Sequence, residues 1–148
     1  MNVLLDLNYT LVVNSALTFD FKRGPDIPRE TYRDWLVALL REHTVILVTV
    51  RLESLRAATL AGIQAKTNWQ PDAAFFKPDA RRYMPAPDWK RLVLFDYVLP
   101  RYGVDQPYLA LESNAETRAM YTSCGVKSRR VPQQAWDTLP DGEFILPP

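Results

Sequence analysis

The sequence predicts an α/β protein in which helices cover both faces of a parallel sheet, a three-layer sandwich. Short apolar runs, typical of buried parallel strands, alternate along the chain with patterns of about 10–15 residues that are typical of helices. The chain has 148 residues, of which 47% are hydrophobic. This length is enough to bury the core of one domain, so we expect residues 1–148 to form a single domain.

The first half of the chain is expected to contribute two strands and two helices. Residues 3–7 form a short apolar run, and residues 14–27 mix polar residues, Gly and Pro, which indicates a loop or small excursion. The pattern from Pro28 to Glu42 predicts a helix with proline in its first turn. Residues 44–50 are rich in β-branched side chains and give the clearest strand. A second helix is expected from Leu52 to about Ile63.

The second half continues the alternation. Further strands are expected over residues 73–76, 108–111 and 126–131, the last at a sheet edge. Residues 79–87 read as a loop. Asp88 is expected to cap a helix that runs to about Tyr102, and another helix is expected from about Ala115 to Cys124. The proline-rich tail after these elements is expected to pack back on the domain.

Composition excludes several classes of protein. The net charge is +1, so the total charge implies no strong field for polyanions, although a local basic patch is allowed. The apolar stretches are far shorter than the roughly 20 residues that span a bilayer, and the N-terminus does not resemble a signal peptide. The one cysteine excludes an internal disulfide. We therefore expect a soluble, cytoplasmic protein with no membrane partner.

Chemistry is expected at the carboxyl ends of the strands, where open parallel sheets bind ligands. The polar residues at these ends are Asp6 and Asn8 on the first strand, Thr49 and Arg51 on the second, Lys77 after the third and Glu112 after the fourth. A carboxylate, a hydroxyl, an ammonium and a second acidic group suit phosphoryl transfer through an aspartyl-phosphate. Acidic groups would hold Mg²⁺, which lets two anions approach each other.

The order of these residues resembles the haloacid-dehalogenase (HAD) superfamily. The segment Val3–Leu11, VLLDLNYTL, resembles the apolar strand and D-x-D-x-T-L motif of that family. Thr49, after an apolar strand, resembles its Ser/Thr motif, and Glu112 resembles its magnesium-binding acidic motif. The resemblance implies a Rossmann-like core, Asp6 as the nucleophile, Thr49 as a phosphoryl ligand, and Mg²⁺ held by Asp6, the Asn8 carbonyl and Glu112.

The same resemblance bears on the size of the substrate. The stretch between Leu11 and Pro28 is too short for a helical cap domain, so a minimal cap or none is expected. An uncapped site suits a large substrate, such as a nucleic-acid end or a phosphoprotein.

A narrower resemblance points to the 3′-phosphatase domain of phage polynucleotide kinases. It is carried by Thr49-Val50-Arg51, the loop from Phe76 through Arg81-Arg82, Asp88-Trp89-Lys90, and Leu109–Glu112 followed by Met120-Tyr121. It implies a nucleotide or polynucleotide 3′-phosphate as the substrate. In this family Arg51, Lys77, Arg81 and Arg82 would contact phosphate groups.

Two lysines match the family's phosphate-contacting lysine. The narrower resemblance assigns this role to Lys90, whereas the general HAD pattern also fits Lys77-Pro78. The position of Lys90 at the start of a helix favours Lys90. That choice leaves Lys77 for substrate phosphate or for structure.

The chain departs from the family at three motif positions. Asn8 stands where an Asp usually acts as general acid and base, a loss that typically costs ~10²–10⁴ in rate. Tyr9 replaces a Gly and would be strained if the position requires a positive φ. Glu112-Ser113 replaces a pair of aspartates. Two functions therefore stay open: a Mg²⁺-dependent phosphohydrolase, or a catalytically weakened HAD-fold module that binds a phosphorylated or nucleic-acid partner without turnover.

Overall fold

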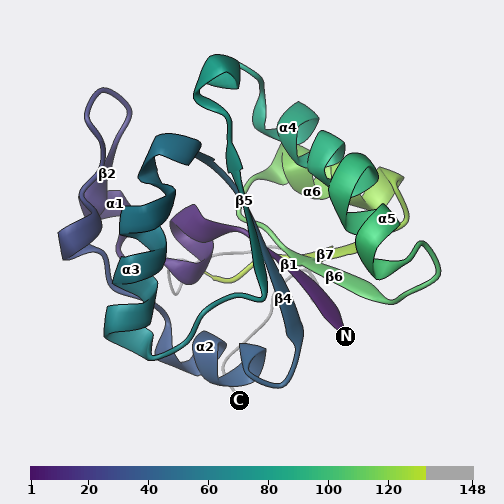
Figure 1. The fold of residues 1–148 in the computed structure, drawn as a ribbon, viewed down its shortest axis with the longest axis horizontal. Helices are drawn as coiled ribbons and strands as arrows, with labels where there is room; N and C mark the ends of the chain where they lie inside the picture. Colours follow the sequence, from purple (N-terminus) through teal and green to yellow (C-terminus); the bar gives the residue numbers. More distant parts are fainter. Residues whose placement is uncertain (133–148) are drawn as a thin grey trace.

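A five-stranded parallel sheet forms the centre of the computed structural model, which describes residues 1–132 (Figure 1). The strand order is β5-β4-β1-β6-β7. The strands are β1 (Asn2–Leu5), β4 (Thr44–Leu52), β5 (Ala73–Lys77), β6 (Tyr108–Leu111) and β7 (Lys127–Arg129). In the register, Leu5 at the end of β1 lies between Leu47 and Leu111. The ends of β1 and β6 therefore lie side by side, and β4 runs beside β1 and continues to Leu52. The predicted tail lies outside the described residues.

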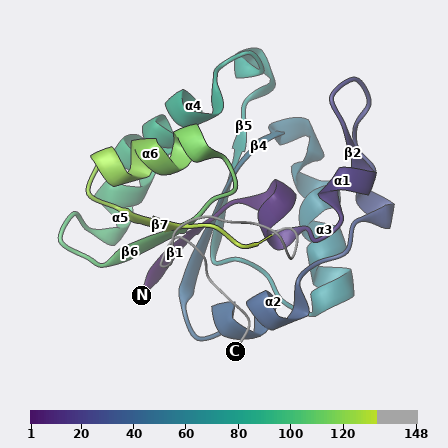
Figure 2. The ribbon, with the colours of Figure 1, turned by 180° about the vertical axis from the view of Figure 1, so that it is seen from behind.

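Helices cover both faces of the sheet, as the three-layer prediction requires. Alternate residues of β1 point to opposite sides, so Val3 and Leu5 lie in one core cluster and Leu4 lies in the other. The helices are α2 (Asp34–Leu40) and α3 (Arg56–Thr67) on the first face, and α4 (Ala86–Val93), α5 (Leu99–Tyr102) and α6 (Ala115–Ser123) on the second (Figures 1 and 2). Residues 94–98 join α4 to α5 as a π-helical turn. The predicted fold class is confirmed.

The excursion between the first strand and α2 is a minimal cap. It contains the single turn α1 (Ser15–Thr18) and a hairpin of β2 (Phe19–Asp20) and β3 (Gly24–Pro25). Gly24 has a φ of 78°, a conformation that glycine adopts without steric cost. The hairpin projects beyond the carboxyl ends of the central strands (Figure 1).

The helix predicted from Pro28 to Glu42 is wrong in its first part, because α2 begins only at Asp34. Ile27–Arg29 forms a 3₁₀ turn, and Tyr32 makes an isolated antiparallel bridge with Val12. Glu30 is fully buried and bonds to Arg51 across the chain. A helical periodicity in the sequence could not reveal that this partner holds the segment in an extended form.

Two other predicted helix starts shift by a few residues. Strand β4 continues to Leu52, so α3 starts at Arg56 rather than at Leu52. Helix α4 starts at Ala86, directly after Pro85, and Asp88 lies in its first turn instead of capping it. Proline is tolerated at a helix start because its missing N–H would have no helical partner there. In residues 1–132, no helix is long and apolar enough to cross a bilayer.

Candidate active site

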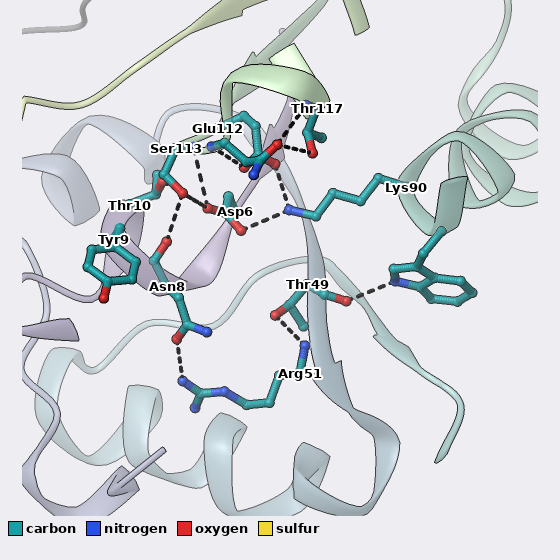
Figure 3. A network of polar contacts seen from close by, with 12 residues as sticks. Asp6, Asn8, Tyr9, Thr10, Thr49, Arg51, Lys90, Glu112, Ser113 and Thr117 are labelled. Carbon is teal, nitrogen blue, oxygen red and sulfur yellow. Dashed lines mark hydrogen bonds and ion pairs between the residues drawn. The ribbon is translucent and has the colours of Figure 1, made fainter. Parts of the chain in front are cut away.

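Asp6 lies directly after β1, at the point where the chain turns away from the sheet. The backbone N–H of Asp6 donates to the Leu111 carbonyl at 2.9 Å, and the side chain is buried. Residues 7–11 then form a tight turn in which Tyr9 has a φ of 60°. This is the left-handed conformation that favours glycine, and it costs a tyrosine roughly 1–2 kcal/mol. After this turn the Asn8 carbonyl faces Ser113 beside Asp6, and the Asn8 side chain extends toward Arg51 (Figure 3).

Lys90 connects the two carboxylates of the site. Its Nζ donates to Asp6 Oδ1 at 2.8 Å and to Glu112 Oε2 at 2.6 Å, and its side chain is only 2% exposed. The three groups come from the end of β1, from α4 and from the end of β6 (Figure 3). Each buried charge therefore has a partner of opposite sign, which an isolated buried charge would lack.

The electrostatics of this centre follow from burial and from the Lys90 charge. Burial alone would raise the pKa of Asp6, but Lys90 outweighs it and holds this pKa below its usual value. Burial alone would lower the pKa of Lys90, but Asp6 and Glu112 together raise it. Burial and the negative charge of Asp6 raise the pKa of Glu112 to about 7. Asp6 therefore stays ionised to a lower pH than Glu112 does.

The second oxygen of Asp6 faces hydroxyl groups. Asp6 Oδ2 accepts from Ser113 Oγ at 2.8 Å and from Thr10 Oγ1 at 3.1 Å. Ser113 Oγ also lies 3.2 Å from the Asn8 carbonyl oxygen. Thr10 is the Thr of the D-x-D-x-T-L pattern, so the motif did contain a signal for it. Only the structure shows that Ser113 meets both Asp6 and Asn8.

The side chain of Asn8 is oriented by Arg51. Arg51 Nη2 donates to Asn8 Oδ1 at 2.8 Å, and the same guanidinium forms a buried ion pair with Glu30 at 2.6 Å. A guanidinium can only donate, so the amide oxygen must face Arg51 and the amide NH₂ must point away from it. In Figure 3 the NH₂ group points toward Thr49. The sequence did not identify Glu30 as a residue of this site, because no recognisable motif surrounds it.

Thr49 lies in the carboxyl-terminal half of β4, which runs on to Leu52, and it is buried. Thr49 Oγ1 accepts from the backbone N–H of Arg51 at 3.0 Å, and its carbonyl accepts from Trp89 Nε1 at 2.9 Å. The first bond closes a local turn, and the second fixes α4 to β4 beside Lys90. The structure thus brings together six of the predicted site residues: Asp6, Asn8, Thr49, Arg51, Lys90 and Glu112.

The other three predicted residues lie apart from Asp6. Lys77 Nζ donates to the carbonyls of Arg82 and Met84, so it closes the loop after β5. Burial and the positive charge of Lys90 lower the pKa of Lys77. Arg81 and Arg82 are exposed on that loop. Between the two candidate lysines, it is Lys90 that contacts Asp6.

The oxygen atoms near Asp6 suit a hard cation. Both Glu112 oxygens are engaged, one by Lys90 and the other by the Asn114 N–H at 2.9 Å. Asp6 Oδ2, the Asn8 carbonyl and Ser113 Oγ form a separate group of oxygens, the ligand type that Mg²⁺ prefers. In the described part of the chain, no cluster of three His, Cys, Asp or Glu residues could hold a metal. A metal here would depend on one carboxylate and neutral oxygens.

Fold and site together define a Rossmann-like α/β protein with a carboxylate–lysine–carboxylate centre at the carboxyl ends of its central strands. No family model and no curated protein matches the chain. Among solved structures, a chain from the Pnkp1/Rnl/Hen1 RNA repair complex matches this chain with a TM-score of 0.69 and 15% sequence identity. The match covers 88% of this chain and 42% of that chain. At this identity, the likeness shows a shared fold.

Proposed function

We propose that this protein is a Mg²⁺-dependent phosphohydrolase of the HAD type that removes a 3′-phosphate from a nucleotide or polynucleotide. The observation that carries the proposal is the contact of Lys90 with both Asp6 and Glu112. A buried ammonium beside a carboxylate nucleophile reduces the repulsion that an incoming phosphoryl anion meets. It also keeps the nucleophile ionised, in agreement with the lowered pKa of Asp6.

In the proposed reaction a carboxylate oxygen of Asp6 forms a bond to phosphorus while the bond from phosphorus to the 3′-oxygen breaks. Lys90 and the Thr49 hydroxyl hold phosphoryl oxygens. The Asn8 amide can donate a hydrogen bond to the leaving oxygen, but it cannot give up a proton, so that oxygen takes its proton from water. Water then attacks phosphorus, loses a proton to solvent and releases phosphate and the Asp6 carboxylate.

The proposed metal site uses Asp6, the Asn8 carbonyl and Ser113. Glu112, the other ligand that the sequence predicts, already bonds to Lys90 and to the Asn114 amide. A bound Mg²⁺ would supply positive charge between the phosphate and Asp6, which a neutral amide and hydroxyl cannot supply.

Three observations support a nucleic-acid end as the substrate. The fold is shared with a chain from an RNA repair complex. Arg81 and Arg82 are exposed on the loop that follows β5 and can meet a phosphate backbone there. A minimal cap leaves room for a long substrate.

A second candidate function is a module of the same type that binds a phosphorylated or nucleic-acid partner without turnover. Two side chains favour it, since Asn8 cannot act as an acid and Ser113 brings no charge to the metal site. The retained contact between Asp6 and Lys90 favours the enzyme instead, because a carboxylate nucleophile is not needed for binding alone.

An assay of variants separates the two functions. The substrates are p-nitrophenyl phosphate and 3′-phosphorylated oligonucleotides with Mg²⁺. Asp6→Ala and Lys90→Met should abolish hydrolysis, whereas Lys77→Met, a matched change at the end of β5 away from Asp6, should retain most of it. Lys90→Met leaves two buried carboxylates unpaired and should cost ~3–5 kcal/mol of stability, so its folding is checked by circular dichroism. If the unaltered chain and Asn8→Asp are both inert on every substrate, the enzyme is excluded in favour of the binding module.

A further inference from the structure

Two segments project on the carboxyl side of the sheet and flank the site. We call residues 19–25 the hairpin arm and residues 79–85 the loop arm. Both rise on the same side of the molecule in the two opposite views, the hairpin arm beyond α1 and the loop arm between β5 and α4 (Figures 1 and 2). The segment between β4 and α3 bonds to the loop arm, where the Ser54 N–H donates to Asp79 Oδ1 at 3.1 Å, and its Leu55 lines a cavity together with the hairpin arm.

The tips of the two arms carry the same kinds of residue. The hairpin arm has Phe21-Lys22-Arg23, and the loop arm has Arg81-Arg82-Tyr83. Phe21 is 96% exposed and Tyr83 is 86% exposed, so neither ring packs into the core. The Arg82 guanidinium lies 5.0 Å from the centre of the Tyr83 ring. Each arm therefore presents an aromatic face and two cations to solvent.

The acidic residues of the arms, Asp20 and Asp79, accept hydrogen bonds from backbone N–H groups. Asp20 Oδ1 accepts from the N–H groups of Lys22 and Arg23 at 2.7 and 2.9 Å, which closes the hairpin turn. Asp79 accepts from Ser54, as described above. Neither carboxylate forms an ion pair with the cations of its own arm among the contacts within residues 1–132. Arg82 donates to the Asp79 carbonyl at 3.3 Å, whereas no side-chain bond within residues 1–132 engages Lys22, Arg23 or Arg81, so these three cations can meet an external anion.

An apolar cavity of about 170 Å³ lies between the hairpin arm and the site. Phe19, Pro25, Val50 and Leu55 contribute its apolar walls, and Asn8 and Arg51 lie at its polar end. The rings of Phe19 and Phe21 meet edge to face at 5.1 Å, so the apolar surface continues from the cavity to the tip of the arm. A planar base with a phosphate at Asp6 would meet this surface first.

We propose that the two arms and this cavity form a binding track for a single-stranded nucleic-acid end, which rests on the proposed function for the position of its terminal phosphate. The terminal base occupies the cavity. Phe21 and Tyr83 stack on unpaired bases, and Lys22, Arg23, Arg81 and Arg82 contact the phosphates. Bases in a duplex are already stacked and paired, so their faces are not available to the two rings. The track therefore selects an unpaired end over a blunt duplex.

The test measures binding without turnover. A short oligoribonucleotide with a 3′-hydroxyl and a fluorescent 5′ end is titrated with the full chain, as a single strand and as a blunt duplex, by fluorescence anisotropy. Phe21→Ala and Tyr83→Ala should each weaken single-strand binding by about 5-fold to 150-fold, the effect of removing one ring that stacks on a base. The double variant Lys22→Ala, Arg23→Ala should make the binding constant less dependent on salt. The negative slope of its logarithm against the logarithm of salt concentration should become shallower by about 0.7 for each phosphate that the protein no longer neutralises.

Phe95→Ala is the matched control. Phe95 is 44% exposed and lies under the Arg91 guanidinium at 5.1 Å, but it belongs to the helical segment after α4 and to neither arm. This variant should bind as the unaltered chain does. Circular dichroism of Phe21→Ala should show an intact fold because this ring is exposed.

Three results would overturn the track: no measurable single-strand binding, tighter binding of the duplex, or equal affinity of Phe21→Ala and Phe95→Ala. The probe carries no 3′-phosphate, so its binding does not depend on catalysis. Absence of hydrolysis with the expected binding pattern would reject the phosphohydrolase and leave the track. Hydrolysis with equal binding by the two Phe variants would reject the track and leave the phosphohydrolase.

Discussion

Two residues near Asp6 bear on different steps of the proposed reaction: Lys90 on the binding of phosphate, and Asn8 on the transfer of a proton. Lys90 contacts Asp6 and gives the proposed nucleophile a positive neighbour. At position 8 the chain has an amide, and Arg51 fixes which end of that amide faces the site. In the proposed reaction, Lys90 would thus attract the phosphoryl group, whereas position 8 would offer no acid to protonate the leaving oxygen.

We expect Asn8→Asp to raise the rate on 3′-phosphorylated oligonucleotides by about 10²-fold, near the lower end of the usual range for an added general acid. Arg51 keeps the gain low, since its guanidinium favours the ionised form of a carboxylate at position 8. Hydrolysis of p-nitrophenyl phosphate should change little, because p-nitrophenolate leaves without a proton. Steady-state rates on both substrates provide the measurement.

Asn114→Asp serves as the charge control for this prediction. Asn114 caps α6 by accepting from the Thr117 N–H at 2.9 Å, and aspartate caps helices equally well. The variant adds the same charge near the site without placing it at the leaving group. An equal gain from Asn114→Asp, or an equal gain on both substrates, would contradict a role as general acid.

At the scale of elements, the position of Lys90 depends on how α4 is fixed to β4. Trp89 is buried in the second core cluster and bonds through Nε1 to the Thr49 carbonyl. The next residue, Lys90, then extends toward Asp6 from the second turn of the same helix (Figure 3). The contact of Trp89 with Thr49 thus fixes the position of α4 against β4, and with it the position of Lys90, the cation that contacts Asp6.

We expect Trp89→Phe to lower the free energy of unfolding by ~1–3 kcal/mol, because the Thr49 carbonyl would lose its partner in a buried position. The hydrolysis rate should fall as well, since the start of α4 could then shift relative to Asp6. Urea unfolding and steady-state kinetics measure the two effects. Trp35→Phe makes the same change against the opposite core cluster. If it lowers the hydrolysis rate as much, the Trp89 bond is not what positions Lys90.

At the scale of the whole molecule, the proposed metal ligands come from two strand ends that only the folded chain brings together. Asp6 and Asn8 follow β1, and Ser113 follows β6, more than a hundred positions later in the sequence. Leu5 and Leu111 pair across β1 and β6, and this register places the two ends side by side. A ligand of this site therefore binds the folded state and stabilises it.

Magnesium should raise the free energy of unfolding by about 2.7 kcal/mol when its concentration is 100 times the dissociation constant. Asp6→Asn should remove this effect. Ser113→Asp should reach the same shift at lower magnesium, because a carboxylate there would face Asp6 Oδ2 and the Asn8 carbonyl. Thermal melts across a magnesium series provide the measurement, with Ser123→Asp on the exposed end of α6 as the control. A shift that persists in Asp6→Asn would place the ion elsewhere.

Much of the fold was accessible from the sequence, because strand and helix patterns are local. The apolar runs predicted β1, β4, β5 and β6 to within a few residues. The helix predicted from Pro28 failed where a contact between distant residues, Glu30 and Arg51, holds the chain extended. The starts of α3 and α4 also differ from the prediction, because hydrophobic periodicity does not show the exact residue at which a helix begins.

The sequence by itself determined the succession of strands and helices along the chain and the polar residues near the strand ends, since a short strand is formed by residues that are neighbours along the chain. The tertiary structure alone decided which of those residues meet. It placed Lys90 rather than Lys77 on Asp6, across 84 positions of sequence. It also brought the Arg51 guanidinium into contact with both Glu30 and Asn8. Such contacts depend on how a helix packs against a sheet, and no local pattern records that packing.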